Sequence, residues 1–146
     1  MLLETQLKLD LDPAWEKTLS GTQKQQLQGK VSTLDHSIDL FHIICFHTNQ
    51  KKNGGFVLSL LLCNYLKQSL PLNQVKIDIT NREKGVFING EFTPHIVLKP
   101  RTVKPWSFIF EPEQTTIRNK HFTEGTITFQ ITSNENPILY HDTFIM

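Results

Sequence analysis

The sequence predicts a mainly β protein: an antiparallel two-sheet β-sandwich of the Ig-like or fibronectin-like kind with a short N-terminal helical segment. Apolar and polar residues alternate with a period of two in several stretches after residue 36, as in strands with one buried face. Turn signals separate these stretches roughly every 8 to 15 residues, which is typical of a sandwich. Short connections of this kind favour antiparallel pairing.

Composition indicates a globular chain. The 146 residues fit one domain over residues 1–146, and 38% hydrophobic with 20% charged residues argues against disorder. The net charge of +1 provides no overall field that would attract nucleic acid or an anionic membrane. Charges interrupt the apolar residues near the N-terminus, so no signal peptide is expected, and the apolar run at residues 55–63 is too short for a transmembrane helix. We therefore expect a cytoplasmic protein, with peripheral attachment to the membrane or cell surface as the alternative.

The N-terminal third predicts helices after a short extended segment. Residues 1–12 form an arm or an edge strand, and residues 13–31 are helical. Asp12 can cap a first helix that begins with Pro13 and carries Trp15. Ser20 or Thr22 can cap a second helix, in which Leu27 would pack against a sheet.

The sandwich strands are expected within residues 37–145. Residues 37–48 are apolar on both faces, which favours a central strand, and residues 55–66 return antiparallel after a polar turn. Residues 67–74 read as a loop. Strands follow at residues 75–80 and 86–92, with a bulge expected at Gly90, and pairing extends to about residue 98. Two more strands are expected from residue 125 to 131 and from 138 to the end.

Residues 93–113 form a proline-bounded segment that is expected to contain a central structural element of the fold. A strand that begins at Pro105 would place Trp106, Phe108 and Phe110 on one face and Ser107 and Ile109 on the other. The aromatic row predicts a core strand behind a stiff loop.

Histidines and cysteines offer little chemistry. In a regular strand His42 and His47 project to opposite faces and His36 lies far from both, which argues against a metal site. Cys45 and His47 would share a face, but apolar neighbours would keep the thiol protonated. Cys63 is expected to be a second buried thiol. No nucleotide-binding pattern occurs, so no catalytic, metal or cofactor residues are assigned.

The solvent side of the proline-bounded segment is the tentative interaction surface, formed by His95, Lys99, Arg101 and Lys104. Acidic neighbours at positions 111 and 113 also allow a simpler interpretation, a solvated rim of mixed charge. Unpaired edge strands could bind an extended partner or a second copy of the chain, and the sequence does not select an edge.

Three stretches in a fixed order resemble the SLAP domain of accessory Sec system S-layer assembly proteins from Gram-positive bacilli. They are GGFVLSLLLCNYL, LPLNQVKIDI and GVFINGEFTPHIVLKPRTVKPWSFIFEPE. The resemblance covers about residues 7 to 131, and its structural signature is Trp15, Pro105, Trp106, Phe108 and Phe110. It implies a non-enzymatic, cofactor-free module that binds secretion or surface-layer proteins. The alternatives are a β-sandwich that binds a cell-wall polymer or ligand and a small Cys/His enzyme.

Overall fold

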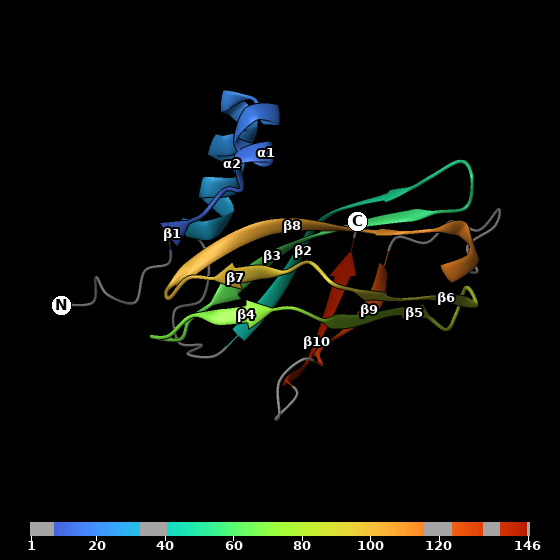
Figure 1. Cartoon of the computed structure of the whole chain (residues 1–146). Helices are drawn as coiled ribbons and strands as arrows, with labels where there is room; N and C mark the ends of the chain where they lie inside the picture. The colour runs from blue at the N-terminus through green and yellow to red at the C-terminus, as the bar shows by residue number, and fades with distance from the viewer. Residues whose placement is uncertain (1–7, 33–40, 116–123, 133–137, 146) are drawn as a thin grey trace.

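The computed structural model describes residues 8–32, 41–115, 124–132 and 138–145, and it is mainly β, as predicted (Figure 1). The helices are α1 (Pro13–Thr18), α2 (Gly21–Ser32) and the 3-10 helix η2 (Pro112–Gln114). The strands are β1 (Lys8–Leu9), β2 (Phe41–Gln50), β3 (Phe56–Asn64), β4 (Leu70–Leu72), β5 (Val75–Asn81), β6 (Val86–Phe92), β7 (Ile96–Leu98), β8 (Thr102–Phe110), β9 (Glu124–Ile131) and β10 (Ile138–Ile145).

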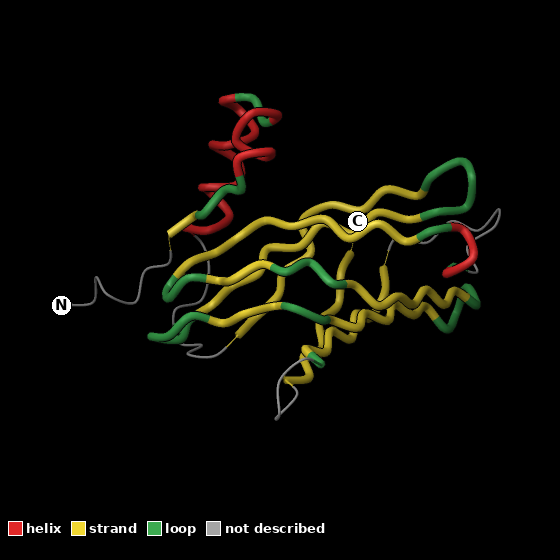
Figure 2. The backbone as a smooth tube through the Cα atoms, viewed as in Figure 1, coloured by secondary structure: helices red, strands yellow, loops and turns green. Residues whose placement is uncertain are grey.

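Two four-stranded sheets form the body of the molecule. The first sheet has the strand order β1-β8-β3-β2, and the second sheet has the order β10-β9-β5-β6. A short pair, β4 and β7, extends one end (Figure 2). All pairs are antiparallel except β1 with β8, which run parallel. The prediction of antiparallel pairing throughout was therefore wrong at this edge, because β1 returns to β8 from a distant part of the chain rather than through a hairpin.

The main core lies between the two sheets. Alternation along β5, β6 and β9 turns one face of the second sheet inward, and β2, β3 and β8 supply the opposite face. The buried side chains include Phe56, Leu58, Leu60, Leu62, Ile77, Ile79, Ile88, Phe110, Ile127, Phe129 and Ile131. This face-to-face packing confirms the sandwich-like arrangement, while the Ig-like or fibronectin-like topology stays a prediction.

The aromatic row of β8 takes its predicted direction, but the strand begins earlier than expected. Phe108 and Phe110 are buried in the main core, Trp106 packs against it, and Ile109 faces solvent. The strand starts at Thr102, so Pro105 lies inside it opposite Leu61. The Val103 carbonyl accepts from the Asp10 N–H at 2.8 Å, so the backbone groups of Val103 point toward β1 and away from β3. Because backbone groups of successive residues in a strand point to alternate sides, those of the other odd-numbered residues of β8 also point away from β3. A proline is tolerated there because its missing N–H costs no bond to β3.

The β2–β3 hairpin is confirmed, with a bulge that the alternation did not predict. Its register shifts between Cys45, opposite Leu60, and His47, opposite Ser59. Phe46 is the extra residue, and the shift reverses the expected face of His47. The expectation of a central strand was also wrong, because β2 ends the strand order of the first sheet and β3 is central. Its apolar faces are explained by the second sheet on one side and the helices on the other.

Both helices have the N-terminal caps that the sequence predicted, and they cover part of the outer face of the first sheet. The Asp12 carboxylate accepts from the Ala14 N–H at 3.0 Å, and the Ser20 hydroxyl accepts from the Gln23 N–H at 3.1 Å. Leu27 is buried with Leu61 in a second, smaller core. Figure 1 shows both helices standing over the end of the first sheet that carries β1.

Two smaller predictions were wrong. The expected loop at residues 67–74 contains β4, which pairs with β7. Gly90 carries no bulge, because β5 and β6 keep one register from Val75 opposite Phe92 onward. A Cβ at Gly90 would lie 3.0 Å from ring atoms of Phe92 and from the Gln114 amide nitrogen. The glycine therefore leaves space for side chains rather than bending the strand.

Candidate functional site

The outer edge of β8 is only partly paired. β1 pairs with Thr102 and Val103, and within the described residues no strand pairs with this edge beyond them. Because odd-numbered residues face outward here, the N–H and C=O groups of the partly exposed Ser107 and the exposed Ile109 point to the open side, and the C=O of the buried Pro105 points the same way. The edge thus offers two hydrogen-bond donors and three acceptors in a row.

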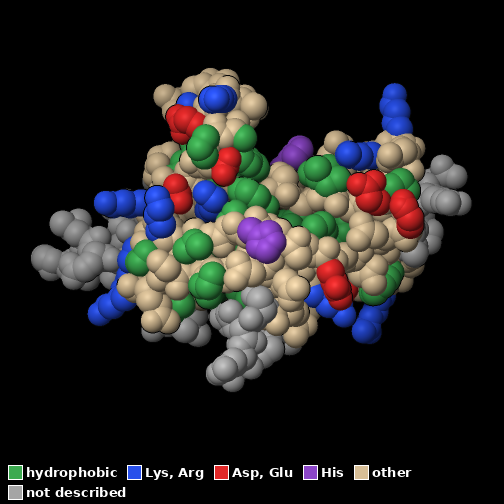
Figure 3. Space-filling model, viewed as in Figure 1, with side chains coloured by type: hydrophobic (Ala, Val, Ile, Leu, Met, Phe, Trp, Pro, Cys, Tyr) green, Lys and Arg blue, Asp and Glu red, His purple; other side chains and the backbone are tan. Residues whose placement is uncertain are grey.

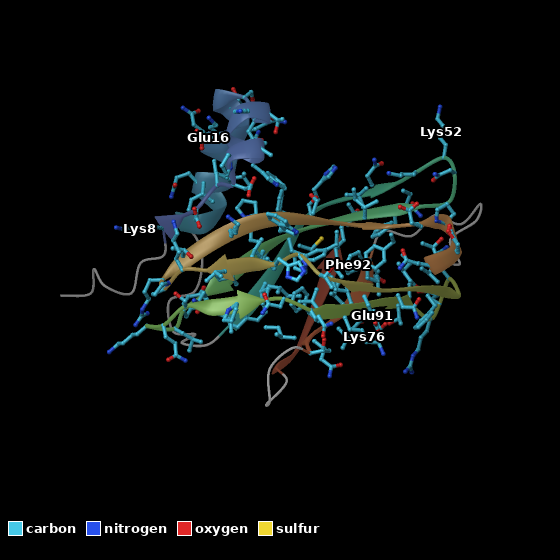
Figure 4. The ribbon with its side chains drawn as sticks, in the orientation of Figure 1. Lys8, Glu16, Lys52, Lys76, Glu91 and Phe92 are labelled. Carbon is cyan, nitrogen blue, oxygen red and sulfur yellow. The ribbon has the colours of Figure 1, made fainter. Side chains whose placement is uncertain are left out.

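The signature aromatics build the inner flank of this edge. The Phe92 ring packs edge-on against Phe108 at 5.2 Å and Phe110 at 5.1 Å between centroids, and Phe108 packs against Phe129 at 5.9 Å. Figure 4 shows Phe92 near the end of β6, beside β8. Trp15 belongs to the other side of the first sheet, where it packs against Phe46 at 6.2 Å. These contacts give the signature residues a structural role.

The tentative interaction surface divides into exposed and buried members. His95 and Lys99 are exposed and Arg101 is half-buried, whereas Lys104 is only 8% exposed. The Lys104 ammonium lies 3.7 Å from the Asp10 carboxylate and 6.0 Å from the centroid of Trp106. Lys104 is therefore engaged in contacts within the fold. The exposed part of the predicted surface consists of the other three residues.

Backbone strain marks the same segment. His95 (φ 51°) and Arg101 (φ 58°) are the non-glycine residues in the left-handed region among the described residues. Such conformations cost about 1–3 kcal/mol and persist where the surroundings fix them. The Arg101 N–H donates to the Leu66 carbonyl at 3.3 Å, and the Arg101 carbonyl accepts from the Lys8 N–H at 3.1 Å.

Asn64 holds the loop before β8 in place. This fully buried side chain donates through Nδ2 to the carbonyls of Leu98 and Lys99, each at 3.1 Å, and to that of Gln68 at 3.0 Å. Its Oδ1 accepts from the Leu66 N–H at 3.0 Å. One amide thus joins three chain segments, a role that the sequence reasoning missed because Asn64 lies inside an apolar run.

A basic end surrounds this loop. An open hollow of about 470 Å³ is lined by Tyr65, Leu66, Lys67, Gln68 and Arg101. Figure 3 shows Lys and Arg side chains at the end of the molecule where Figure 1 places β1 and the β7–β8 turn. Lys8 projects outward from β1 (Figure 4). We call Lys8, Lys67, Lys99 and Arg101 the basic end.

A second hollow of about 330 Å³ lies where the helices meet the first sheet. Trp15, Leu19 and Leu27 form its helical wall, and Phe46, His47 and Ser59 form its sheet wall. Ser59 is engaged with Ser107 through their hydroxyls at 2.7 Å, and Gln23 on the rim is engaged in the cap of α2. The hollow is mostly apolar.

The two outer faces of the sandwich differ in charge. On the outer face of β2, β3 and β8 the described residues are all uncharged or histidine: His42, Ile44, Phe46, His47, Asn49, Val57, Ser59, Leu61, Cys63, Val103, Pro105, Ser107 and Ile109. On the second sheet, Lys76 and Glu91 are cross-strand partners on the outer face (Figure 4). The second sheet thus presents an ordinary solvated face, and the first sheet does not.

The bulge rearranges the histidines and cysteines. His42 lies opposite Cys63 and His47 opposite Ser59, so both histidines lie on the outer face, and the prediction of opposite faces was wrong. Cys45 faces the main core, which separates its thiol from the His47 ring that was expected beside it. The Cys45 thiol instead donates to the His47 carbonyl at 3.8 Å. Burial raises the pKa of the Cys63 thiol to about 12.

Neither a cluster of metal ligands nor a helix able to span a membrane occurs among the described residues. No three His, Cys, Asp or Glu side chains within the described ranges lie close enough together to hold a metal ion; His36 falls outside those ranges. None of the described helices has the length and apolar character that a membrane span needs.

The family model of the SLAP domain matches residues 9–131, which is most of the chain and runs from Leu9 of β1 to the end of β9. No curated protein matches the chain. The match contains the complete edge of β8, the helices and the basic end apart from Lys8, and it confirms the resemblance found in the sequence. The chain belongs to the SLAP domain family.

Proposed function

We propose that the chain is a non-enzymatic protein-interaction module that assists the secretion or assembly of S-layer or other cell-surface proteins. The observation that carries the proposal is the SLAP domain match over residues 9–131. The family resemblance implies an accessory role in secretion and no catalytic residues. Its partners are then components of the secretion apparatus or the surface proteins themselves, and its place is the cytoplasm or the membrane periphery.

The arrangement of the reactive side chains supports a non-enzymatic role. A cysteine nucleophile needs a base within hydrogen-bond reach and a thiol that ionises. Cys45 and His47 project to opposite faces of the first sheet, and the raised pKa of Cys63 keeps that thiol protonated near neutral pH.

A secretion assay in the bacillus-type host tests the proposal. Removing the chain is expected to lower the amount of surface protein that leaves the cell, and affinity capture with the tagged chain is expected to enrich secretion or surface proteins. The Cys45→Ala and His47→Gln variants should restore secretion as fully as the parent chain. Unchanged secretion together with no enrichment would refute the proposed role, and failure of the Cys45→Ala variant in a folded chain would favour an enzyme.

The basic end favours a second candidate, binding of an anionic cell-wall polymer. Lys67 and Arg101 line the same open hollow, and the backbone of Arg101 is bonded to those of Leu66 and Lys8. Fixed cations of this kind attract phosphate or carboxylate groups. Sedimentation with purified wall should then fall with added salt and with the Lys67→Gln and Arg101→Gln variants, but not with Lys76→Gln on the second sheet. Equal sedimentation of all three variants would exclude the basic end as the site.

A further inference from the structure

We propose that the open edge of β8, residues 105–109, binds an extended, uncharged segment of a partner polypeptide as an added strand. This inference rests on the proposed function as a protein-interaction module and names the surface and the form of the partner. Strand addition uses main-chain hydrogen bonds for affinity and flanking side chains for selectivity.

β1 already shows that this edge accepts a strand. Lys8 and Leu9 pair in parallel with Thr102 and Val103, and the Asp10 N–H continues the pairing to the Val103 carbonyl. The chain then turns away at Asp12 into α1, so the remaining outward groups of β8 continue the same row. An added strand would extend an interface that the fold itself uses.

The side chains beside the edge favour an uncharged, partly apolar segment. Ile109 is 50% exposed on the outer face, next to Ser107, and the half-buried Trp106 lies on the inner flank with Phe92. Alternate residues of an added strand would contact these two flanks. The nearest charge on β8, Lys104, is already paired with Asp10. A charged residue placed over the Trp106 flank would therefore lose water without gaining a partner on β8.

The other sheet edges are less suitable. β2 lies beside β10 of the second sheet. The free side of β6 is bridged by Thr115 opposite Ile88, and the strand exposes Glu91 on its outer face. β8 thus combines outward backbone groups, uncharged flanking side chains and, among the described residues, no strand paired beyond Val103.

The backbone argues for a different polypeptide rather than a second copy of this chain. In an antiparallel pair of two β8 strands centred on Ser107, Pro105 of each copy would face Ile109 of the other. Each proline lacks an N–H, so the pair would lose two hydrogen bonds, whereas a different segment loses one. A buried carbonyl left without its donor costs about 1–3 kcal/mol.

Peptide binding to the full chain tests the inference. The probes are a ten-residue peptide of alternating Val and Thr, the same peptide with Lys in place of alternate Thr, and the first peptide with N-methyl groups on alternate amides. We expect the first to bind, with slowed hydrogen exchange at the Ser107 and Ile109 amides, and the other two to bind at least about tenfold more weakly. Equal binding of the N-methylated peptide would overturn main-chain pairing.

The Ser107→Pro and Ser107→Ala variants isolate one outward N–H. Both lose the hydroxyl contact with Ser59, but only proline removes the amide, and at this position the amide does not pair with β3. Ser107→Pro should bind the first peptide about tenfold more weakly than Ser107→Ala. Ile109→Lys should also weaken binding, while Val97→Lys, at a site of similar exposure (52%) on β7, should not.

The outcomes separate this inference from the proposed function. If Ser107→Pro no longer binds the peptide yet still captures secretion proteins from the host, the β8 edge is not the binding surface for these proteins, and the proposed function is supported. If the peptide binds at the edge but removal of the chain leaves secretion unchanged, strand addition at β8 is supported and the proposed role in secretion is refuted. Concentration-dependent dimerisation that Ser107→Pro abolishes would overturn the choice of a different polypeptide as occupant.

Discussion

The Lys104 ammonium and the Asp10 carboxylate face each other at 3.7 Å across the junction of β1 and β8. Their side chains are 10% and 23% exposed, so the pair is largely withdrawn from water. It links the N-terminal extended segment to the strand that carries the candidate edge. Because Lys104 is one of the four residues of the predicted interaction surface, this contact also explains why that surface is smaller than the sequence suggested.

Removing the charge of Asp10 should cost more than removing that of Lys104, because the ammonium left behind is more deeply buried than the carboxylate, with side chains 10% and 23% exposed. Asp10→Asn leaves the ammonium without its counter-charge and should lower the free energy of unfolding by about 1–3 kcal/mol. Lys104→Met keeps the stem that packs near Trp106 and should change stability by less than about 1 kcal/mol. Urea unfolding measures both, with the exposed Lys76→Met as the control. A larger loss in Lys104→Met than in Asp10→Asn would contradict the pairing.

Asn64 should be among the least replaceable polar residues. Asn64→Leu leaves the carbonyls of Leu98 and Lys99 and the Leu66 N–H without the amide, so we expect a loss of about 3 kcal/mol or more. Chemical unfolding compared with Asn89→Leu, an exposed position, measures the difference. A loss below about 1 kcal/mol would show that the loop does not depend on this side chain.

Two glycines should respond to alanine in opposite directions. Gly90→Ala places a Cβ 3.0 Å from the Phe92 ring, which is held by Phe108 and Phe110, and should destabilise by about 1–3 kcal/mol. Gly29→Ala meets open space within α2 and should stabilise by about 0.5–1 kcal/mol. Thermal unfolding of both variants provides the measurement. Stabilisation by Gly90→Ala would contradict the close packing at this strand.

Cys63 should make stability depend on alkaline pH. Its folded pKa of about 12 lies above the ordinary value of 9.0, so the folded state holds the proton after the unfolded state has lost it. This contribution is complete below pH 9 and is lost as pH rises from 9 toward 12, by up to about 1.4 kcal/mol per pH unit. Unfolding of the parent and of Cys63→Ala between pH 8 and 10 measures the difference. Identical slopes would contradict the burial of this thiol.

The sequence predicted what depends on local pattern. The alternation in β5, β8 and β9, the Asp12 cap and the β2–β3 hairpin each follow from residues close together in the chain. The bulge at Phe46 could not be predicted, because the residues whose face it reverses, from His47 to the end of β2 at Gln50, are polar and leave the apolar pattern almost unchanged. The parallel pairing of β1 with β8 joins residues more than ninety positions apart, and no local signal specifies it.

The candidate site was predictable only in part. The sequence singled out the segment around Pro105, since prolines and aromatic residues are conspicuous there. It did not show which backbone groups of β8 face outward, because that depends on the register with β3 and on the position where β1 stops. Nor did it show that the Asp10 carboxylate pairs with the Lys104 ammonium, because the two residues are far apart in the chain.

Site-specific photo-crosslinking in the host cell tests the central claim most directly. A photoreactive residue at position 109, on the open edge of β8, is compared with one at position 97, which has similar exposure on β7. The account predicts an adduct with a secretion component or a surface protein from position 109 that is weak or missing from position 97 and that Ser107→Pro abolishes. Equal adducts from both positions, or none from position 109 in a host that depends on the chain for secretion, would contradict it.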